Sequence, residues 1–272
     1  MERLIAVHDK AVITEFLMRD PLANVLVIGD LDDFFWPSTV WYGWEVNENL
    51  VDIALLYVGA GLPVLLCFAE ADDPHAGGFC NMLQTVLPAA VYTHLYPDVD
   101  RFFSDQYRFV PHGRHYKMAL READRLEDID TRGVVPLSPS ALPAIQNIFD
   151  TAYPGNFFDP RMLETGMYYG IWENEQLVSV AGIHVYSEEY DVAAIGNVTT
   201  HPAYRNRGLA KQVMAKLIQA LQQKVHHITL NVKQENRPAI RVYEQLGFQV
   251  LRAYDEFEFY RRNSPFPAGS AD

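Results

Sequence analysis

The chain has 272 residues, 49% of them hydrophobic and 21% charged, which excludes a disordered protein because there is ample material for a packed interior. The formal charge of −13 argues against nucleic acid or an anionic membrane as a partner, since both require a basic surface. The acidity is concentrated in residues 1–135, which carry 10 Lys and Arg against 21 Asp and Glu, whereas residues 136–272 carry 12 against 14. An anionic ligand is therefore expected in the second half.

The cysteines and the N-terminal residues indicate the cellular compartment in which the protein is expected. Cys67 and Cys80 are too few for a disulfide framework and lack the Cys-x-x-Cys spacing of a metal site. Residues 1–4 lack the basic-then-apolar pattern of a signal peptide. The longest uncharged stretch, 53–69, is interrupted by glycines and a proline, whereas a membrane span needs about 20 unbroken apolar residues. We expect a soluble, cytoplasmic protein; the sequence leaves its oligomeric state open.

Helices and strands follow one another in the first half. In chain order, the pattern predicts helices at 11–18 and 24–28, an apolar hairpin block at 41–68 with strands at 53–58 and 63–68, a helix at 78–86, a strand at 90–95, a helix at 98–107 and a strand that ends at 120.

A boundary between two domains is predicted near the middle of the chain. Residues 121–132 are dense in charge and poor in large apolar side chains, and a glycine and a proline follow. We therefore predict a linker at 121–135 between domains at 1–120 and 136–272. The alternative is an exposed helix within a single domain.

The second half has clearer signals. Ser138-Pro139 and Asp159-Pro160 both combine an N-cap residue with a proline at the first helical position. The pattern predicts helices at 138–153, from 159, at 207–223 and at 238–246, and strands at 168–172, 177–185, 192–199, 228–232 and 249–260. The fold class is therefore α/β (α+β), a mixed, mostly antiparallel sheet flanked by helices.

The two halves end alike. Residues 106–109 (Gln-Tyr-Arg-Phe) and 245–248 (Gln-Leu-Gly-Phe) both follow a predicted helix and precede a predicted final strand. An internal duplication would explain this correspondence. Chance is the alternative, because such endings are common in unrelated α/β folds.

The segment 197–210 (Asn-Val-Thr-Thr-His-Pro-Ala-Tyr-Arg-Asn-Arg-Gly-Leu-Ala) carries the chemical signal. A strand ends, a proline prevents its continuation, and a turn with Gly208 leads into a long helix. The first turn of a helix presents unpaired N–H groups and the positive end of its dipole, and a glycine lets a phosphate approach. Arg205 and Arg207 add positive charge. The alternative is an ordinary helix start with a solvated pair of arginines.

This segment resembles the GNAT superfamily of acyl-CoA-dependent N-acetyltransferases. Residues 205–210 fit its Arg/Gln-x-x-Gly-x-Gly/Ala signature, and further landmarks follow in order: a strand at 230–232, Asn236, Tyr243 and Gly247-Phe248. The resemblance covers about 136–260, and the motif is absent from the first half. It implies two tandem GNAT-like copies, the first degenerate, as in the glycine acyltransferase-like branch.

The resemblance implies that acetyl-CoA, or another acyl-CoA, is a co-substrate and that no metal is required. Its pyrophosphate would bind the N–H groups of the Gly208 loop, and its pantetheine arm would pair with the end of the third strand, where one N–H would stabilise the oxyanion. The implied donor-binding residues are Val198, Thr199, Thr200, Arg205, Asn206, Arg207, Gly208, Leu209, Ala210 and Asn236.

By the same resemblance, Tyr243 would be the general acid that protonates the departing thiolate; the alternative is a half-buried aromatic on an amphipathic helix. An amine of a small molecule would attack the thioester directly in a ternary complex. His184 is a candidate base because imidazole titrates near neutrality, although a core histidine is the alternative. Asp191, Glu189 and Glu258 are further candidates.

One apparent metal motif is excluded, and two questions stay open in the sequence. His226 and His227 predict no metal site, because neighbours on a strand point to opposite faces. Aromatic residues at 153–169 predict either core or an acceptor pocket formed by Tyr153, Phe157, Phe158 and Tyr168. An acetyltransferase for small amines is the leading interpretation; the alternatives are a non-catalytic acyl-CoA-binding module and a protein acetyltransferase.

Overall fold

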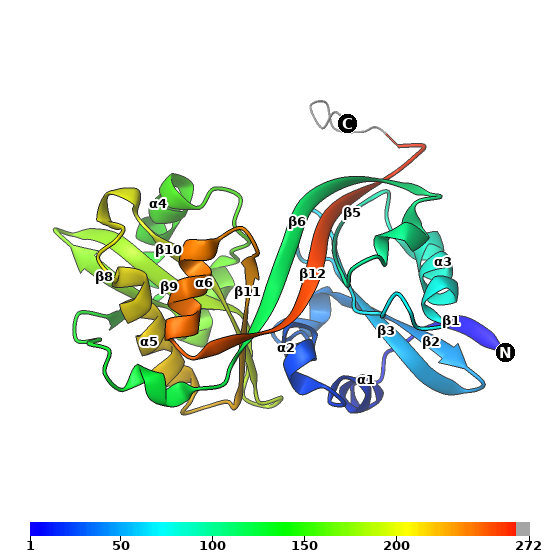
Figure 1. Ribbon diagram of the computed structural model, residues 1–272, viewed down its shortest axis with the longest axis horizontal. Coiled ribbons are helices and arrows are strands. Elements are labelled where there is room, and N and C mark those ends of the chain that lie inside the picture. Colours follow the sequence, from blue (N-terminus) through cyan, green and yellow to red (C-terminus); the bar gives the residue numbers. More distant parts are fainter. Residues whose placement is uncertain (265–272) are drawn as a thin grey trace.

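The computed structural model describes residues 1–264, and over these residues twelve strands form one continuous sheet (Figure 1). The strand order is β1-β2-β3-β4-β5-β12-β6-β11-β10-β9-β8-β7. The strands are β1 (Glu2–Ala6), β2 (Thr39–Val46), β3 (Asn49–Tyr57), β4 (Val64–Cys67), β5 (Ala90–Leu95), β6 (Tyr107–Leu120), β7 (Val135–Pro136), β8 (Tyr169–Glu173), β9 (Gln176–Ser187), β10 (Val192–Thr200), β11 (His227–Lys233) and β12 (Phe248–Arg261).

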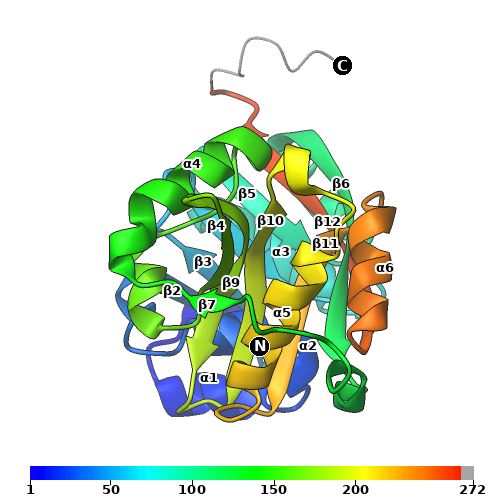
Figure 2. The ribbon, with the colours of Figure 1, turned by 90° about the vertical axis from the view of Figure 1, so that its left-hand side faces the viewer.

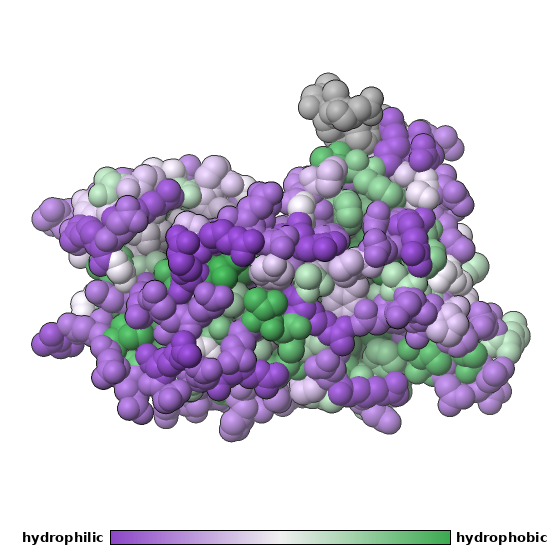
Figure 3. Space-filling model, in the orientation of Figure 1, coloured by the Kyte–Doolittle hydropathy of each residue, from purple (hydrophilic) through white to green (hydrophobic). Residues whose placement is uncertain are grey.

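Six α-helices flank this sheet in the described part of the chain. They are α1 (Lys10–Leu17), α2 (Pro21–Gly29), α3 (Ala76–Val86), α4 (Leu142–Ala152), α5 (Leu209–Leu221) and α6 (Arg237–Gln245). Helices α5 and α6 lie side by side (Figure 2). None of the described helices is long and apolar enough to cross a bilayer, and the face shown in Figure 3 is largely hydrophilic.

The same order of elements occurs twice. Each half begins with a short strand and helical segments, continues with three strands, a helix and a strand, and closes with a helical turn or helix and a long strand. The pairs β4–β5 and β10–β11 are parallel, and the other neighbouring pairs of the described sheet are antiparallel. The predicted mixed, mostly antiparallel sheet is confirmed, and the repeated order is what an internal duplication would produce.

The last strand of each half completes the sheet of the other half. Strand β6 pairs with β11, β12 pairs with β5, and the two long strands pair with each other between the two lobes (Figure 1). Helix α2 of the first half packs against β9, β10 and β11 of the second. Residues on β6 therefore lie close to the second half, and residues on β12 close to the first, although the sequence separates them.

The segment predicted as a linker holds a short 3₁₀ helix, Ala123–Leu126, with Leu126 buried. The division into 1–120, 121–135 and 136–272 stays a prediction about folding units, because the strand exchange joins both halves in one sheet. Residues 265–272 of the predicted second domain lie outside the described residues.

The helix predicted at 98–107 is wrong. Asp98 has a φ of +67°, which is incompatible with an α-helix, and the structure forms a 3₁₀ helix, Asp100–Phe103, before β6 begins. The helix predicted from 159 is likewise a 3₁₀ helix, Pro160–Thr165, which ends at Gly166. Both short segments occupy positions where the other half has a full helix.

We expect Gly247→Ala to destabilise the fold. Gly247 has a φ of +92°, and a Cβ there would lie 2.1 Å from the carbonyl oxygen of Glu122, a backbone atom that cannot rotate away. The left-handed conformation and the clash together should cost about 3 kcal/mol of unfolding free energy. Urea denaturation measures this loss. Gly133→Ala is the control, because nothing lies within 4 Å of a Cβ there, and an equal loss in both variants would contradict the argument.

Candidate active site

The loop between β10 and α5 forms an open helix N-terminus. β10 ends at Thr200, a 3₁₀ turn follows at Pro202–Tyr204, and α5 begins after Gly208, which has a φ of +78°. Gly208 is exposed, and no atom lies within 4 Å of the position of a Cβ. The predicted helix start is therefore displaced from 207 to 209, because the left-handed glycine forms the N-cap.

The first turn of α5 has unpaired donors. The N–H of Gln212 donates to the carbonyl of Gly208 at 3.2 Å, and no side chain caps the helix. Within the described residues, no hydrogen bond is found for the N–H groups of 207–211. These N–H groups and the positive end of the helix dipole are the features that favour an anion such as a phosphate at a helix start.

The two arginines flank this turn in different ways. The Nε of Arg205 donates to the carbonyl of Thr200 at 3.2 Å, which holds its guanidinium beside the end of β10. Arg207 forms a bidentate pair with Glu173 at 2.6 and 3.1 Å and lies over the ring of Tyr204. Arg205 therefore carries the less compensated charge, since Glu173 neutralises Arg207.

Strand β10 carries a bulge at the point where it leaves β11. The parallel pairing of β10 with β11 stops at Ile195 and Leu230. Asn197 has a φ of +55°, and the register with β9 shifts between Gly196 and Thr199. The strands therefore diverge from Gly196 onward and leave backbone groups of 196–198 without a strand partner on the β11 side.

A buried polar pair fixes this bulge. Asn197 is 2% exposed, and its Nδ2 donates to the hydroxyl of Tyr168 at 2.9 Å. That hydroxyl donates in turn to the carbonyl of Ile183 at 2.9 Å. Tyr168 therefore supports the bulge from the core, which is a different position from the acceptor pocket that the sequence suggested.

Helix α6 provides Asn236 and Tyr243. The Oδ1 of Asn236 accepts from the N–H of Ala239 at 3.2 Å, so this side chain caps the helix. Tyr243 is 9% exposed, and no hydrogen bond to its hydroxyl is found in the described part of the chain. Burial, with a smaller effect of the Tyr153 charge, raises the pKa of Tyr243, so its hydroxyl keeps its proton well above neutral pH.

His184 lies at the bulge. Its ring occupies the space beside Gly196, where a Cβ would come within 2.2 Å of the imidazole, and Phe157 packs at 6.1 Å between ring centroids. Its Nδ1 is buried without a hydrogen-bond partner. Burial, then the charge of His94, lowers the pKa of His184 to about 4, so the ring is neutral but a weak base.

A carboxylate that the sequence did not indicate lies near His184. Glu256 on β12 accepts hydrogen bonds from the hydroxyls of Tyr92 and Tyr254, and its oxygens lie 3.5 Å from the Nε2 atoms of His94 and His115. Its side chain is 12% exposed, and the two imidazoles are its only ion-pair partners within residues 1–264.

Glu256 is charged at neutral pH. Burial would raise its pKa, but His94 and His115, with hydrogen bonds from two tyrosines, outweigh that effect and hold the pKa below its ordinary value. Its charge also influences the pKa of both His184 and Tyr153, and Tyr153 influences that of Tyr243. The strand exchange thus brings an anionic group from β12 within electrostatic reach of His184 and Tyr153.

Two of the other predicted bases have partners of their own. Asp191 binds His226 through its ring and its N–H, and it precedes Gly196 by five residues, about 16 Å along the strand. Glu189 lies in the same turn between β9 and β10. Glu258 accepts from Tyr260 and lies 3.1 Å from the Nε2 of His112.

The aromatic residues at 153–169 divide into two groups. Phe158 and Tyr168 belong to the core, where Phe158 packs against Phe149 and Tyr168. Tyr153 and Phe157 are 44% and 42% exposed, and Phe157 meets Tyr57 of the first half edge to face. Of the four, only this second group is exposed, and Phe157 also packs against His184. Within residues 1–264, no three His, Cys, Asp or Glu side chains gather as metal ligands.

Comparisons with known proteins agree with this geometry. The profile of the Acetyltransferase (GNAT) family matches residues 137–248. No curated protein sequence matches the chain.

Three solved structures share its fold. A Drosophila protein is 12% identical with a TM-score of 0.73, covering 97% of this chain and 100% of that one. A GCN5-related N-acetyltransferase from Sphaerobacter thermophilus is 16% identical with a TM-score of 0.62, covering 99% and 98%. A tandem GNAT protein from the clavulanic acid biosynthesis pathway is 13% identical with a TM-score of 0.58, covering 98% and 100%. The family match identifies a GNAT acetyltransferase domain at residues 137–248, which indicates an acyltransferase, and the solved structures show that the whole chain shares their fold.

Proposed function

We propose that this chain transfers an acetyl group from acetyl-CoA to the amine of a small molecule by direct attack in a ternary complex. The observation that carries the proposal is the uncapped N-terminus of α5 beside the β10 bulge, with the buried hydroxyl of Tyr243 on the neighbouring helix. An acceptor with an amino-acid amine would be consistent with the resemblance to the glycine acyltransferase-like branch.

The pyrophosphate of the donor would bind the N–H groups of 207–210, with Arg205 beside it. The pantetheine arm would run along the free edge of β10 at Val198–Thr200, where β10 has left β11. An N–H at the bulge would stabilise the oxyanion of the tetrahedral intermediate. Tyr243 would then donate its proton to the departing thiolate, and coenzyme A would leave.

Glu256 would attract the acceptor and take its proton. An alkyl ammonium ion is charged at neutral pH, and Glu256 offers a partly buried negative charge without a Lys or Arg partner among the described residues. A proton can pass from the ammonium to this carboxylate directly or through water before the amine attacks. His184, whose pKa is about 4, would contribute to the shape of the site and less to proton transfer.

We expect Glu256→Gln to lower kcat/KM for an alkyl amine about tenfold at pH 7. The loss should shrink as the pH approaches the pKa of the amine, because the free amine needs no base. The pH profile of acetyl transfer measures this. Glu258→Gln is the matched control on the same strand and should leave the profile unchanged. A loss that is constant with pH would assign Glu256 a structural role only.

The rival function is acyl-CoA binding without catalysis. A screen of small amines with acetyl-CoA separates the two: binding of the donor without any acetylated product would favour the rival. Acetylation confined to lysine side chains of peptides would favour a protein acetyltransferase.

A further inference from the structure

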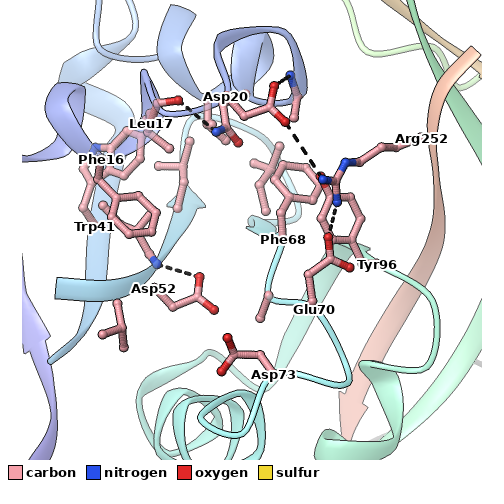
Figure 4. A pocket seen from close by; sticks show the side chains of 18 residues that line it. Phe16, Leu17, Asp20, Trp41, Asp52, Phe68, Glu70, Asp73, Tyr96 and Arg252 are labelled. Atoms are coloured by element: carbon pink, nitrogen blue, oxygen red, sulfur yellow. Dashed lines mark hydrogen bonds and ion pairs between the residues drawn. The ribbon is translucent and has the colours of Figure 1, made fainter. Parts of the chain in front are cut away.

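A pocket of about 220 Å³ lies in the first half, between α1, α2 and β3 on one side and the segment from β4 to α3 on the other (Figure 4). A cavity of about 150 Å³ is known to hold benzene, so this pocket has room for a molecule of roughly ten non-hydrogen atoms. It is separate from the α5 site, since none of its lining residues belongs to the second half except Arg252 on β12.

The wall of the pocket combines aromatic rings with carboxylates. Phe16, Trp41 and Phe68 provide apolar surface, and the carboxylates come from three different segments of the chain. The four acidic residues that line the pocket are Asp20, Asp52, Glu70 and Asp73.

Only two of the four acids have a cationic partner. Arg252 lies at the edge of the pocket, 4.0 Å from Asp20, and forms an ion pair with Glu70 (Figure 4). Asp52 accepts only the N–H of Ile53 at 2.8 Å, and Asp73 only that of His75 at 2.7 Å. Within the described residues, neither has an ion-pair partner, and Figure 4 shows the two carboxylates facing each other.

This pocket lies at the place in the first half that corresponds to the α5 loop in the second half, but the two places differ in charge. It lies where β4 and β5 end, as the acyl-CoA site lies where β10 and β11 diverge. The segment 201–208 before α5 contains two arginines, whereas the segment 68–75 before α3 contains three acids and no Lys or Arg. Asp73 already accepts an N–H at the start of α3. An anionic coenzyme is therefore repelled here, and a cation is favoured.

We propose that this pocket binds a small organic ammonium ion with an aromatic or apolar body. The ammonium group lies between Asp52 and Asp73, where it supplies the positively charged partner that neither carboxylate has among the described residues. The body packs against Phe16, Trp41 and Phe68. The aromatic wall selects an organic cation over a metal ion, which needs oxygen ligands on most sides. This site does not depend on the function of the α5 loop.

The affinity of the pocket should rise with pH. Burial, with smaller effects of Asp73 and Glu70, raises the pKa of Asp52 to about 7, so an ammonium ion binds the ionised form and releases a proton. Burial also lowers the pKa of Lys117 on β6 to about 7, so Lys117 loses its positive charge over the same pH range in which Asp52 ionises. The other groups that face Asp52 or border the pocket are Asp20, Glu70, Cys67, Asp73, Tyr96 and Arg252.

Calorimetric titration of the full chain with 2-phenylethylammonium tests the proposal, with 2-phenylethanol as its uncharged counterpart. We expect the ammonium to bind at least about tenfold more tightly than the alcohol at pH 8, and more weakly at pH 6. Asp52→Asn should lower its affinity about tenfold. Asp72→Asn is the matched control, since Asp72 lies in the same segment, is exposed and does not line the pocket.

Equal affinity for the alcohol, an unchanged affinity in Asp52→Asn, or the same loss in Asp72→Asn would each overturn the proposal. Binding of Ca²⁺ in place of the ammonium would overturn it as well. Asp73→Asn provides a second test should Asp52→Asn not fold, which circular dichroism shows. Gly208→Asp should leave ammonium binding unchanged, so failure of the donor site and failure of this pocket are distinguishable.

Discussion

Replacing Gly208 by Asp is expected to weaken acetyl-CoA binding about 100-fold. The new carboxylate would lie at the N-terminus of α5, where the N–H groups of 207–211 are free to bind a phosphate. Repulsion between this charge and a pyrophosphate a few ångströms away amounts to about 3 kcal/mol at the dielectric of a protein surface, and that energy corresponds to the stated loss. The carboxylate would also cap the helix itself and occupy its donors.

The substitution should leave the fold intact, which makes it a clean test. Asp tolerates the left-handed conformation that Gly208 adopts, and nothing lies within 4 Å of its Cβ. Gly208→Asn is the matched control, because it has the same shape and conformational preference without the charge. Calorimetry with acetyl-CoA should show a much smaller loss for Asn. Equal affinities for the wild type and the Asp variant would place the donor elsewhere.

The conformation of the loop between β10 and α5 could be predicted from the sequence because its determinants are local. A strand, a proline, a left-handed glycine and an amphipathic helix lie within 30 residues, and each has its own physical signature. Leu209, Val213, Leu217 and Leu221, which share one face of that helix, are all buried. Local rules therefore sufficed for α5, although the helix starts two residues later than predicted.

The position of Glu256, which we propose as part of the site, could not be predicted in the same way. The alternation of 254–260 indicates a strand, but no local pattern shows which strand it pairs with. The pairing with β5 brings Glu256 opposite His94, across more than 160 residues of sequence. Bringing together two strands that are this far apart in sequence costs chain entropy, and only the contacts of the whole sheet compensate for that cost. The exchange of β6 and β12 between the halves therefore cannot be predicted from a local pattern.

His184 shows a different limit of sequence reasoning. Its position on a strand that enters the site was predicted, and the structure places it beside Gly196 at the bulge. An isolated imidazole titrates near neutrality, but burial lowers the pKa of His184 to about 4, and burial depends on residues from both halves. The residue type suggested a base, whereas the environment disfavours that role.

Tyr243→Phe is expected to lower kcat for acetyl transfer about 100-fold and to leave the affinity for acetyl-CoA unchanged. The hydroxyl has no hydrogen-bond partner in the described structure, and the ring packs against Phe248 at 6.4 Å between centroids, so phenylalanine keeps the packing. What the variant loses is the proton for the departing thiolate. An interaction that forms only as the thiolate leaves changes kcat and not ground-state binding.

The pH dependence of Tyr243 gives a second, independent readout. An acid acts in its protonated form, and burial raises the pKa of this hydroxyl above the ordinary value of 10.0. The wild-type rate should therefore rise as the amine loses its proton and show no decline from Tyr243 between about pH 8 and 10. Single-turnover rates of the wild type, Tyr243→Phe and the control Tyr169→Phe measure this. If Tyr243→Phe is as fast as the control, another group or water protonates coenzyme A, and Tyr243 contributes only to packing.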